Sequence, residues 1–187
     1  MRRALAALLL LSAAPLAAQN AATPEAGGAE AVVAEYVRAF ATRDYAEAAG
    51  HLDPDELAEF AGLLVTLTHQ AAEDGGPGLF SIDPDAPPAD VFADFLASTT
   101  RAEPLMDEAL ESLRASVVGS VAEGDSLRHV VVRSQFDLAG APTGGVQLTT
   151  ARWTGSRWVV TFDARMKQFK AQLDALANGP QEGGGDG

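Results

Sequence analysis

One short segment of the chain gathers side chains that could bind a metal ion. Within six residues it carries His51, Asp53, Asp55 and Glu56, and imidazole and carboxylate groups are common metal ligands. The segment also has the features of a helix start, because Asp53 can cap a helix that begins at Pro54, and acidic side chains favour a first turn. Since the helix start accounts for most of these residues, we predict a capped helix here and no metal.

A second acidic cluster suggests calcium by its composition. Asp83, Asp85 and Asp90 lie in a segment rich in Gly and Pro. An EF-hand loop that began at Asp83 would need Gly at its sixth position and Glu at its twelfth, whereas the chain has Pro88 and Asp94 there. We therefore expect a solvated loop without a bound ion.

Composition and motifs remove several classes of chemistry. The 187 residues include no Cys, which excludes disulfides, thiolate metal sites and cysteine nucleophiles. They contain no G-x-S-x-G, P-loop, H-E-x-x-H or strand-linked G-x-G-x-x-G motif. Acidic side chains outnumber basic ones by 26 to 13, which argues against a nucleic-acid partner, because such binding relies on Lys and Arg. The sequence predicts no cofactor.

Residues 1–18 have the layout of a secretory signal peptide. Arg2 and Arg3 precede a largely apolar run over residues 4–14, and Ala18 supplies the small residue expected before a cleavage point. The run is shorter than the ~20 residues that cross a membrane. We expect a bacterial periplasmic or secreted protein that begins at Gln19 and has no membrane attachment after cleavage.

The rest of the chain predicts one domain with flexible ends. Residues 19–29 lack apolar periodicity and are interpreted as a flexible linker, and residues 179–187 as a disordered tail. Between them, residues 30–178 form one patterned region with the length of a single domain. Apolar residues recur first at helical spacing. They predict five helices over 30–42, 44–50, 53–70, around 91–96 and 104–113.

From residue 115 onward the pattern alternates with a period of two. Four strands are predicted over 115–123, 127–138, 145–154 and 157–163, and short connections make neighbouring strands antiparallel. A last helix follows, with Met166, Phe169, Leu173 and Leu176 on one stripe. We assign the even-numbered positions of the second strand to the inner face of the sheet. That face is expected to continue through Val146, Leu148, Trp158, Val160 and Phe162.

Helices followed by an antiparallel sheet predict an α+β fold. N-terminal helices would pack on one face of a curved four-stranded antiparallel sheet, with a C-terminal helix after it. The segments AEYVRAFATRDYAEAAGHL and TTARWTGSRWVVTFDARM resemble the opening and the closing of nuclear transport factor two-like domains, also called SnoaL-like or cystatin-like cone domains. The resemblance covers the two ends of residues 30–163, and it implies a cone-shaped pocket between sheet and helices.

The resemblance also implies where catalytic groups would lie. Isomerase members of the family use a Tyr on the first helix and acids that project from the sheet, and Tyr36 matches that Tyr by position. No acid matches, because the alternation assigns Asp137 and Asp163 to the outer face. The polar residues expected on the inner face are Ser134, Thr150 and Arg152. Without a carboxylate to move a proton, we expect no acid–base catalysis, and an isomerase or cyclase-like activity has only the family to support it.

The implied pocket favours noncatalytic binding of a small apolar or amphipathic ligand. The side chains expected to contact that ligand are Tyr36, Ser134, Phe136, Thr150, Arg152 and Trp158. An open cavity above ~300 Å³ would favour this hypothesis. A cone filled by side chains would favour a second hypothesis, a periplasmic interaction or accessory module.

The second hypothesis depends on the outer face of the sheet. His129, Arg133, Gln135 and Asp137 alternate with the apolar positions of the second strand. In the resembling family this face often pairs subunits. The sequence therefore leaves three alternatives open: a homodimer, a different protein partner, and a solvated face.

Overall fold

The computed structural model describes residues 28–73, 82–102 and 104–178. The predicted signal peptide, the predicted tail and nearly all of the predicted linker lie outside these residues. Within them, five helices come first: α1 (Ala29–Ala41), α2 (Tyr45–Gly50), α3 (Pro54–Glu73), α4 (Pro88–Ala102) and α5 (Pro104–Ser112). The strands and a last helix follow: β1 (Arg114–Glu123), β2 (Leu127–Leu138), β3 (Ala141–Trp153), β4 (Trp158–Val160) and α6 (Ala164–Asn178).

The two predicted helix caps are confirmed. The carboxylate of Asp44 accepts a hydrogen bond of 3.0 Å from the backbone N–H of Glu47 at the start of α2. The carboxylate of Asp53 accepts one of 3.1 Å from the backbone N–H of Asp55 at the start of α3. Each bond satisfies an N–H that has no partner within its helix. Helix α3 then continues to Glu73, beyond the predicted end at residue 70.

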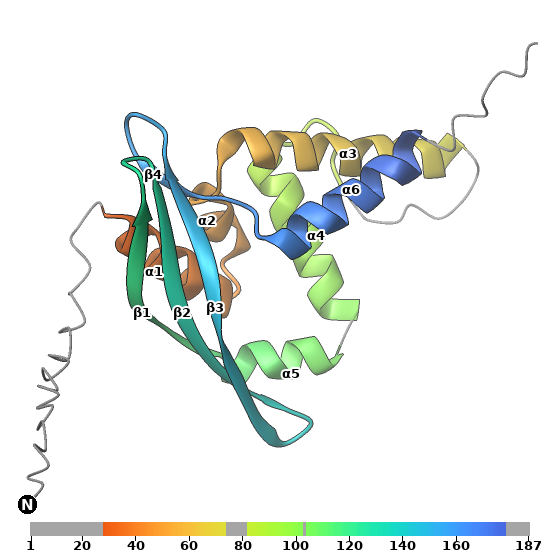
Figure 1. The fold of residues 1–187 in the computed structure, drawn as a ribbon. Helices are drawn as coiled ribbons and strands as arrows, with labels where there is room; N and C mark the ends of the chain where they lie inside the picture. The colour runs from red at the N-terminus through yellow and green to blue at the C-terminus, as the bar shows by residue number, and fades with distance from the viewer. Residues whose placement is uncertain (1–27, 74–81, 103, 179–187) are drawn as a thin grey trace, which may run out of the picture.

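The four strands form one antiparallel sheet in the order β1-β2-β3-β4. Helix α1 contacts all four strands on one face, which we call the inner face; the opposite face is the outer face. Figure 1 shows the sheet curving beside α1 and α2, with α3, α4 and α6 grouped at one side. The predicted α+β fold, with helices on one face of a curved four-stranded sheet and a C-terminal helix, is therefore confirmed.

Aromatic rings fill the interior between α3, α4 and α6. Phe60 of α3 is fully buried, and its ring centroid lies 5.5–6.1 Å from four other rings. The four rings belong to Phe92, Phe95, Phe162 and Phe169. This cluster continues to the inner face of the sheet at Val130 and Val132. The helical side of the interior is thus a packed core that side chains occupy.

The predicted stripe of α6 is correct at Leu173 and wrong at Leu176. Leu173 is buried, whereas Leu176 is exposed. Four residues beyond Leu173 the helix presents Ala177 to the core, and its carbonyl accepts a hydrogen bond of 2.9 Å from the side chain of Gln70 in α3. The contact with α3 therefore follows the i, i+4 step, which turns position 176 to the solvent.

The predicted inner face of β3 is wrong. Val132 lies opposite Gln147 and Val130 opposite Thr149, and residues directly opposite in an antiparallel pair share a face. Because Val130 and Val132 are buried on the inner face, the odd-numbered residues of β3 point inward. Val146 and Leu148 accordingly lie on the outer face.

The turn between β2 and β3 sets this register. Leu138 pairs with Ala141, so the loop has only two residues, Ala139 and Gly140. Both have positive φ, 51° and 75°, as the two central residues of a type I′ hairpin turn require. The whole segment 139–144 was predicted to lie outside the strands, because Ala–Gly is not one of the usual signals for such a turn. A one-residue difference in register exchanges the two faces of a strand.

Candidate functional site

A cavity of about 330 Å³ lies between α1 and the β1–β2 part of the inner face. Small side chains create the space, because three residues of α1 that line it are Ala34, Val37 and Ala41. The strands add Ala115, Val117 and Val132. The walls are thus apolar, as in most small-molecule sites.

Polar groups lie at the margin of this cavity. Its lining includes Arg38, Thr42, Arg114 and Ser116. The guanidinium of Arg38 already forms an ion pair of 2.5 Å with Glu47. The side chain of Arg114 makes no hydrogen bond or ion pair with any residue that the structure describes. Because Arg114 is opposite Gln135, its guanidinium projects from the outer face, away from this cavity. The polar lining residues on the α1 side are Arg38 and Thr42.

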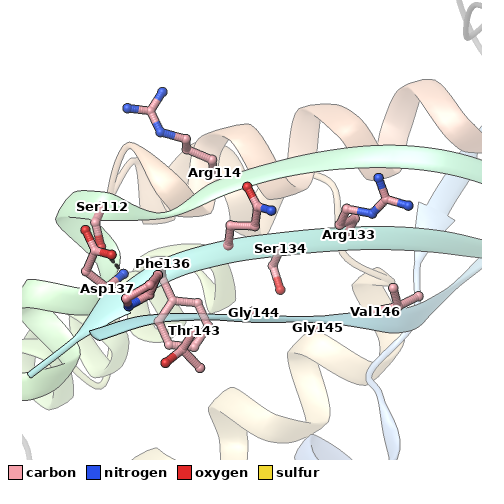
Figure 2. Close-up of a pocket in the computed structure, with 12 residues that line it drawn as sticks. Ser112, Arg114, Arg133, Ser134, Phe136, Asp137, Thr143, Gly144, Gly145 and Val146 are labelled. Atoms are coloured by element: carbon pink, nitrogen blue, oxygen red, sulfur yellow. Dashed lines mark hydrogen bonds between the residues drawn. The ribbon is translucent and has the colours of Figure 1, made fainter. Parts of the chain in front are cut away.

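A second hollow of about 580 Å³ lies at the end of the sheet where β1 begins and the β2–β3 hairpin extends past it. Its lining includes Ser112, Arg114, Arg133, Gln135, Asp137 and Val146. Figure 2 shows the side chains of Arg114 and Arg133 on the same side of the sheet, and those of Ser134 and Thr143 on the other. The hollow therefore presents two guanidinium groups together.

The six predicted ligand-contacting residues do not form one site. Ser134 and Phe136 line the 580 Å³ hollow. Tyr36, Thr150, Arg152 and Trp158 line neither this hollow nor the 330 Å³ cavity. Trp158 packs against Trp153, with ring centroids 5.7 Å apart.

Thr150 and Arg152 lie on the outer face, which corrects their predicted position. Thr150 is opposite His129 and Arg152 opposite Leu127, two residues that alternate with the buried valines of β2. The hydroxyl of Thr150 is 3.1 Å from Nδ1 of His129, whose Nε2 lies 2.6 Å from Glu123. The change of register described above moved both residues from one face to the other.

Arg152 pairs with a buried carboxylate. Its Nε donates a hydrogen bond of 2.8 Å to the carboxylate of Asp53, and its Nη2 also contacts this carboxylate. The hydrogen bond raises the pKa of Arg152 above its already high ordinary value. The side chain of Asp53 is 3% exposed, so this pair joins the end of β3 to the start of α3.

Tyr36 lies in α1 near an acid that the sequence analysis assigned to the outer face. Strand β4 ends at Val160, so Asp163 is not a strand residue; its carboxylate accepts a hydrogen bond of 2.8 Å from the N–H of Met166 in α6. Burial raises the pKa of Tyr36 to about 12, and the charge of Asp163 adds to the increase. The residues that the structure describes make no hydrogen bond to the Tyr36 hydroxyl. The neutral phenol is thus strongly favoured, without a bonded base.

The residues of the His51–Glu56 segment point to different partners. His51 lies 3.9 Å from Glu35, Asp53 binds Arg152, and Glu56 accepts a hydrogen bond from the N–H of Phe162. In the part of the chain that the structure describes, no three His, Asp or Glu side chains are grouped closely enough to hold a metal ion.

None of the described helices is long and apolar enough to cross a membrane.

An apolar surface on the outer face was not predicted from the sequence. We define the outer patch as Val121, Val131, Val146 and Leu148. Val121, Val146 and Leu148 are 64%, 64% and 62% exposed. Val131 is directly opposite Leu148, and Val146 is opposite Arg133. The alternation of Val146 and Leu148 was a visible signal, but it was assigned to the core.

Comparisons with known proteins give one structural similarity. No protein-family model matches the chain, and no curated protein matches it. A solved structure described as "a NTF-2 like protein of unknown function", from Shewanella oneidensis, is similar with a TM-score of 0.40 and 15% sequence identity. The similarity covers 70% of this chain and 88% of that one. The fold of this chain, helices on one face of a curved four-stranded antiparallel sheet, is the one expected from the resemblance of its two terminal segments.

Proposed function

We propose that this domain binds a small apolar or amphipathic ligand in the 330 Å³ cavity between α1 and the sheet. The observation that carries the proposal is the composition of that cavity, which has apolar walls from α1, β1 and β2 and polar residues, Arg38 and Thr42, at its margin. Its volume lies at the lower end of the range for ligand pockets, roughly 300–1,000 Å³. A ligand with a short apolar body and a polar end suits this arrangement.

The side chains on the inner face favour ligand binding without catalysis. With the corrected register, the inner-face positions of the described strands carry no Asp, Glu or His. General acid–base catalysis needs such a group within hydrogen-bond reach of the substrate. Tyr36 and Asp163 lie near one another, yet neither lines the cavity. If Tyr36 is not a ligand contact, Tyr36→Phe leaves ligand affinity within roughly tenfold.

The proposal also includes export. The charged start, apolar run and small residue at Ala18 support removal of residues 1–18. The mature chain then begins at Gln19 and acts in the periplasm or outside the cell. Mass analysis of the exported protein should give a chain that begins at Gln19, and an intact Met1 would contradict this part of the proposal.

Native mass spectrometry of protein isolated from its own host tests ligand binding. We expect a bound small molecule in the wild type and its loss in Ala41→Phe, because the larger side chain fills the cavity. Ala58→Phe, at an exposed position of α3, is the matched control and should keep the ligand. Equal melting temperatures would show that Ala41→Phe is folded. No bound molecule in any form, or one that Ala41→Phe retains, would contradict the proposal.

A second candidate function is protein docking on the outer face. The outer patch favours it, because three large apolar side chains more than 60% exposed on one sheet face are typical of an interaction surface. A photo-crosslinking amino acid at position 148 should give a discrete adduct in the native host, and Val121→Asp should remove it. The same crosslinker at position 58 is the control. Absence of the adduct, or identical adducts from both positions, would contradict docking.

A further inference from the structure

Two arginines on the outer face have no partner in an otherwise acidic chain. Acidic side chains outnumber basic ones by 26 to 13, and five other cations of the described residues form ion pairs with carboxylates. These five are Arg38, Arg43, Arg152, Lys167 and Lys170. The side chains of Arg114 and Arg133 form neither an ion pair nor a hydrogen bond with any described residue. Their positive charges are therefore available to a molecule that binds from outside.

The two arginines are close neighbours on the sheet. Arg114 of β1 is directly opposite Gln135, and Arg133 of β2 is opposite Ser116. They are thus diagonal neighbours on one face, at a separation that long side chains can bridge. Both line the 580 Å³ hollow, and Figure 2 shows both side chains projecting to the same side. A carboxylate placed in the hollow can accept hydrogen bonds from both guanidinium groups.

The hollow is continuous with the outer patch. Val146 lines the hollow and lies directly opposite Arg133, while Leu148 lies two residues further along the same strand. Gln135 and Asp137 complete the polar part of the hollow; the carboxylate of Asp137 can accept a hydrogen bond from a ligand N–H. One surface therefore presents cations, apolar side chains and groups that can bind a peptide backbone.

We propose that this surface binds an acidic segment of a partner protein, with carboxylates at Arg114 and Arg133 and apolar side chains on the outer patch. The proposal rests on the docking function of the outer face and names the chemistry of the partner. Charge complementarity favours a different protein over a second copy of this chain. If two copies paired through this surface, the same two unpaired arginines of each copy would meet at the interface and repel one another. The open shape and the apolar continuation favour a chain segment over a small anion.

Fluorescence anisotropy with two labelled synthetic peptides tests the proposal. One peptide alternates Glu with Val, and the other has Lys in place of each Glu. The Glu peptide should bind the wild type, more weakly as salt is added, and the Lys peptide should not. Arg114→Gln and Arg133→Gln should each weaken binding by about tenfold, the size of one modest charge-assisted hydrogen bond. Arg165→Gln, at an exposed position of α6, is the matched control and should have no effect.

Several outcomes would overturn the proposal. The two peptides could bind equally well, with binding lost in Leu148→Asp and unchanged in the arginine variants. That result would support docking on the outer face and contradict the proposed preference for acidic segments. A partner crosslinked at position 148, together with no binding of either peptide, would also support docking and contradict the preference for acidic segments. Free glutamate or citrate that competes as strongly as the peptide would reveal a small-anion site. A dimer in native mass spectrometry that Arg133→Gln disrupts would identify a second copy as the occupant.

Discussion

The carboxylate of Asp53 binds the guanidinium of Arg152, ninety-nine residues later in the chain. Asp53 is the buried cap of α3, and Arg152 lies near the end of β3. Two more backbone hydrogen bonds hold the same junction, from Asp53 N–H to the Val160 carbonyl and from Val160 N–H to the His51 carbonyl, both 2.8 Å. The start of α3 is thus joined to two strands, which positions the helices against the sheet.

Asp53→Ala should lower the free energy of unfolding by about 2–3 kcal/mol. The change removes a helix cap and a charge-assisted hydrogen bond together. Arg152 is 39% exposed, so water can solvate its free guanidinium, and this limits the loss. Asp55→Ala is the control: its carboxylate is 88% exposed and 4.0 Å from Arg152, and its removal should change stability by roughly 0.5 kcal/mol or less. Urea unfolding measures both, and equal losses would show that burial of Asp53 is unimportant.

Aspartate substitutions on β2 and β3 test the register of the sheet. Val132→Asp should destabilise the fold by about 3 kcal/mol or more, because it buries an unpaired charge. Arg133→Asp and Leu148→Asp should each change stability by roughly 1 kcal/mol or less, since both positions face the solvent. Thermal unfolding compares the three. A large loss in Leu148→Asp would restore the register predicted from the sequence.

Tyr36 makes stability depend on alkaline pH. Its pKa is about 12 in the folded chain and ~10 when unfolded. Between these values the unfolded chain releases the phenol proton and the folded chain retains it. The contribution of Tyr36 to the free energy of unfolding is therefore complete below pH ~10. It decreases as the pH rises towards 12, by up to about 2–3 kcal/mol.

Urea unfolding from pH 9 to 12 measures this dependence. Tyr36→Phe should remove that part of the loss, and the difference between the two proteins isolates it from other titrating groups. Asp163→Asn removes a charge that helps to raise the pKa of Tyr36. Above pH 10 this variant should therefore lose less stability than the wild type, and the difference should be smaller than that produced by Tyr36→Phe. Identical pH profiles for wild type and Tyr36→Phe would mean that Tyr36 titrates normally.

Two glutamates of α3 that both pair with lysines of α6 should contribute unequally. Glu56 binds Lys167 at 3.1 Å and also accepts a hydrogen bond of 2.5 Å from the N–H of Phe162, whereas Glu59 binds only Lys170. Glu56→Ala should cost about 1–2 kcal/mol because it leaves a backbone N–H without its partner. Glu59→Ala should cost roughly 0.5 kcal/mol or less, because that pair is largely exposed. Denaturant midpoints that shift equally would contradict the distinction.

The sequence by itself determined the elements and their order. Local signals were sufficient for this: the caps at Asp44 and Asp53, the apolar stripe of α1 and the period-two pattern after residue 115 each depend on neighbouring residues. These signals predicted an α+β fold with five helices first, then the sheet, and one helix at the end. The buried positions of β2, Val130 and Val132, were also predicted correctly, because the alternation within one strand identifies its two faces.

Only the tertiary structure decided how the strands meet and which surfaces remain open. The two-residue turn at Ala139 and Gly140 set a register that no local pattern specified, and a shift of one residue moved Leu148 from the predicted core to the solvent. The same shift separated Thr150 and Arg152 from Tyr36, so the predicted ligand-contacting set did not assemble. The partner of Asp53 and the proximity of Arg114 to Arg133 likewise come from the pairing of separate elements. Such contacts depend on the pairing of whole elements, which the spacing of residues within one element does not encode.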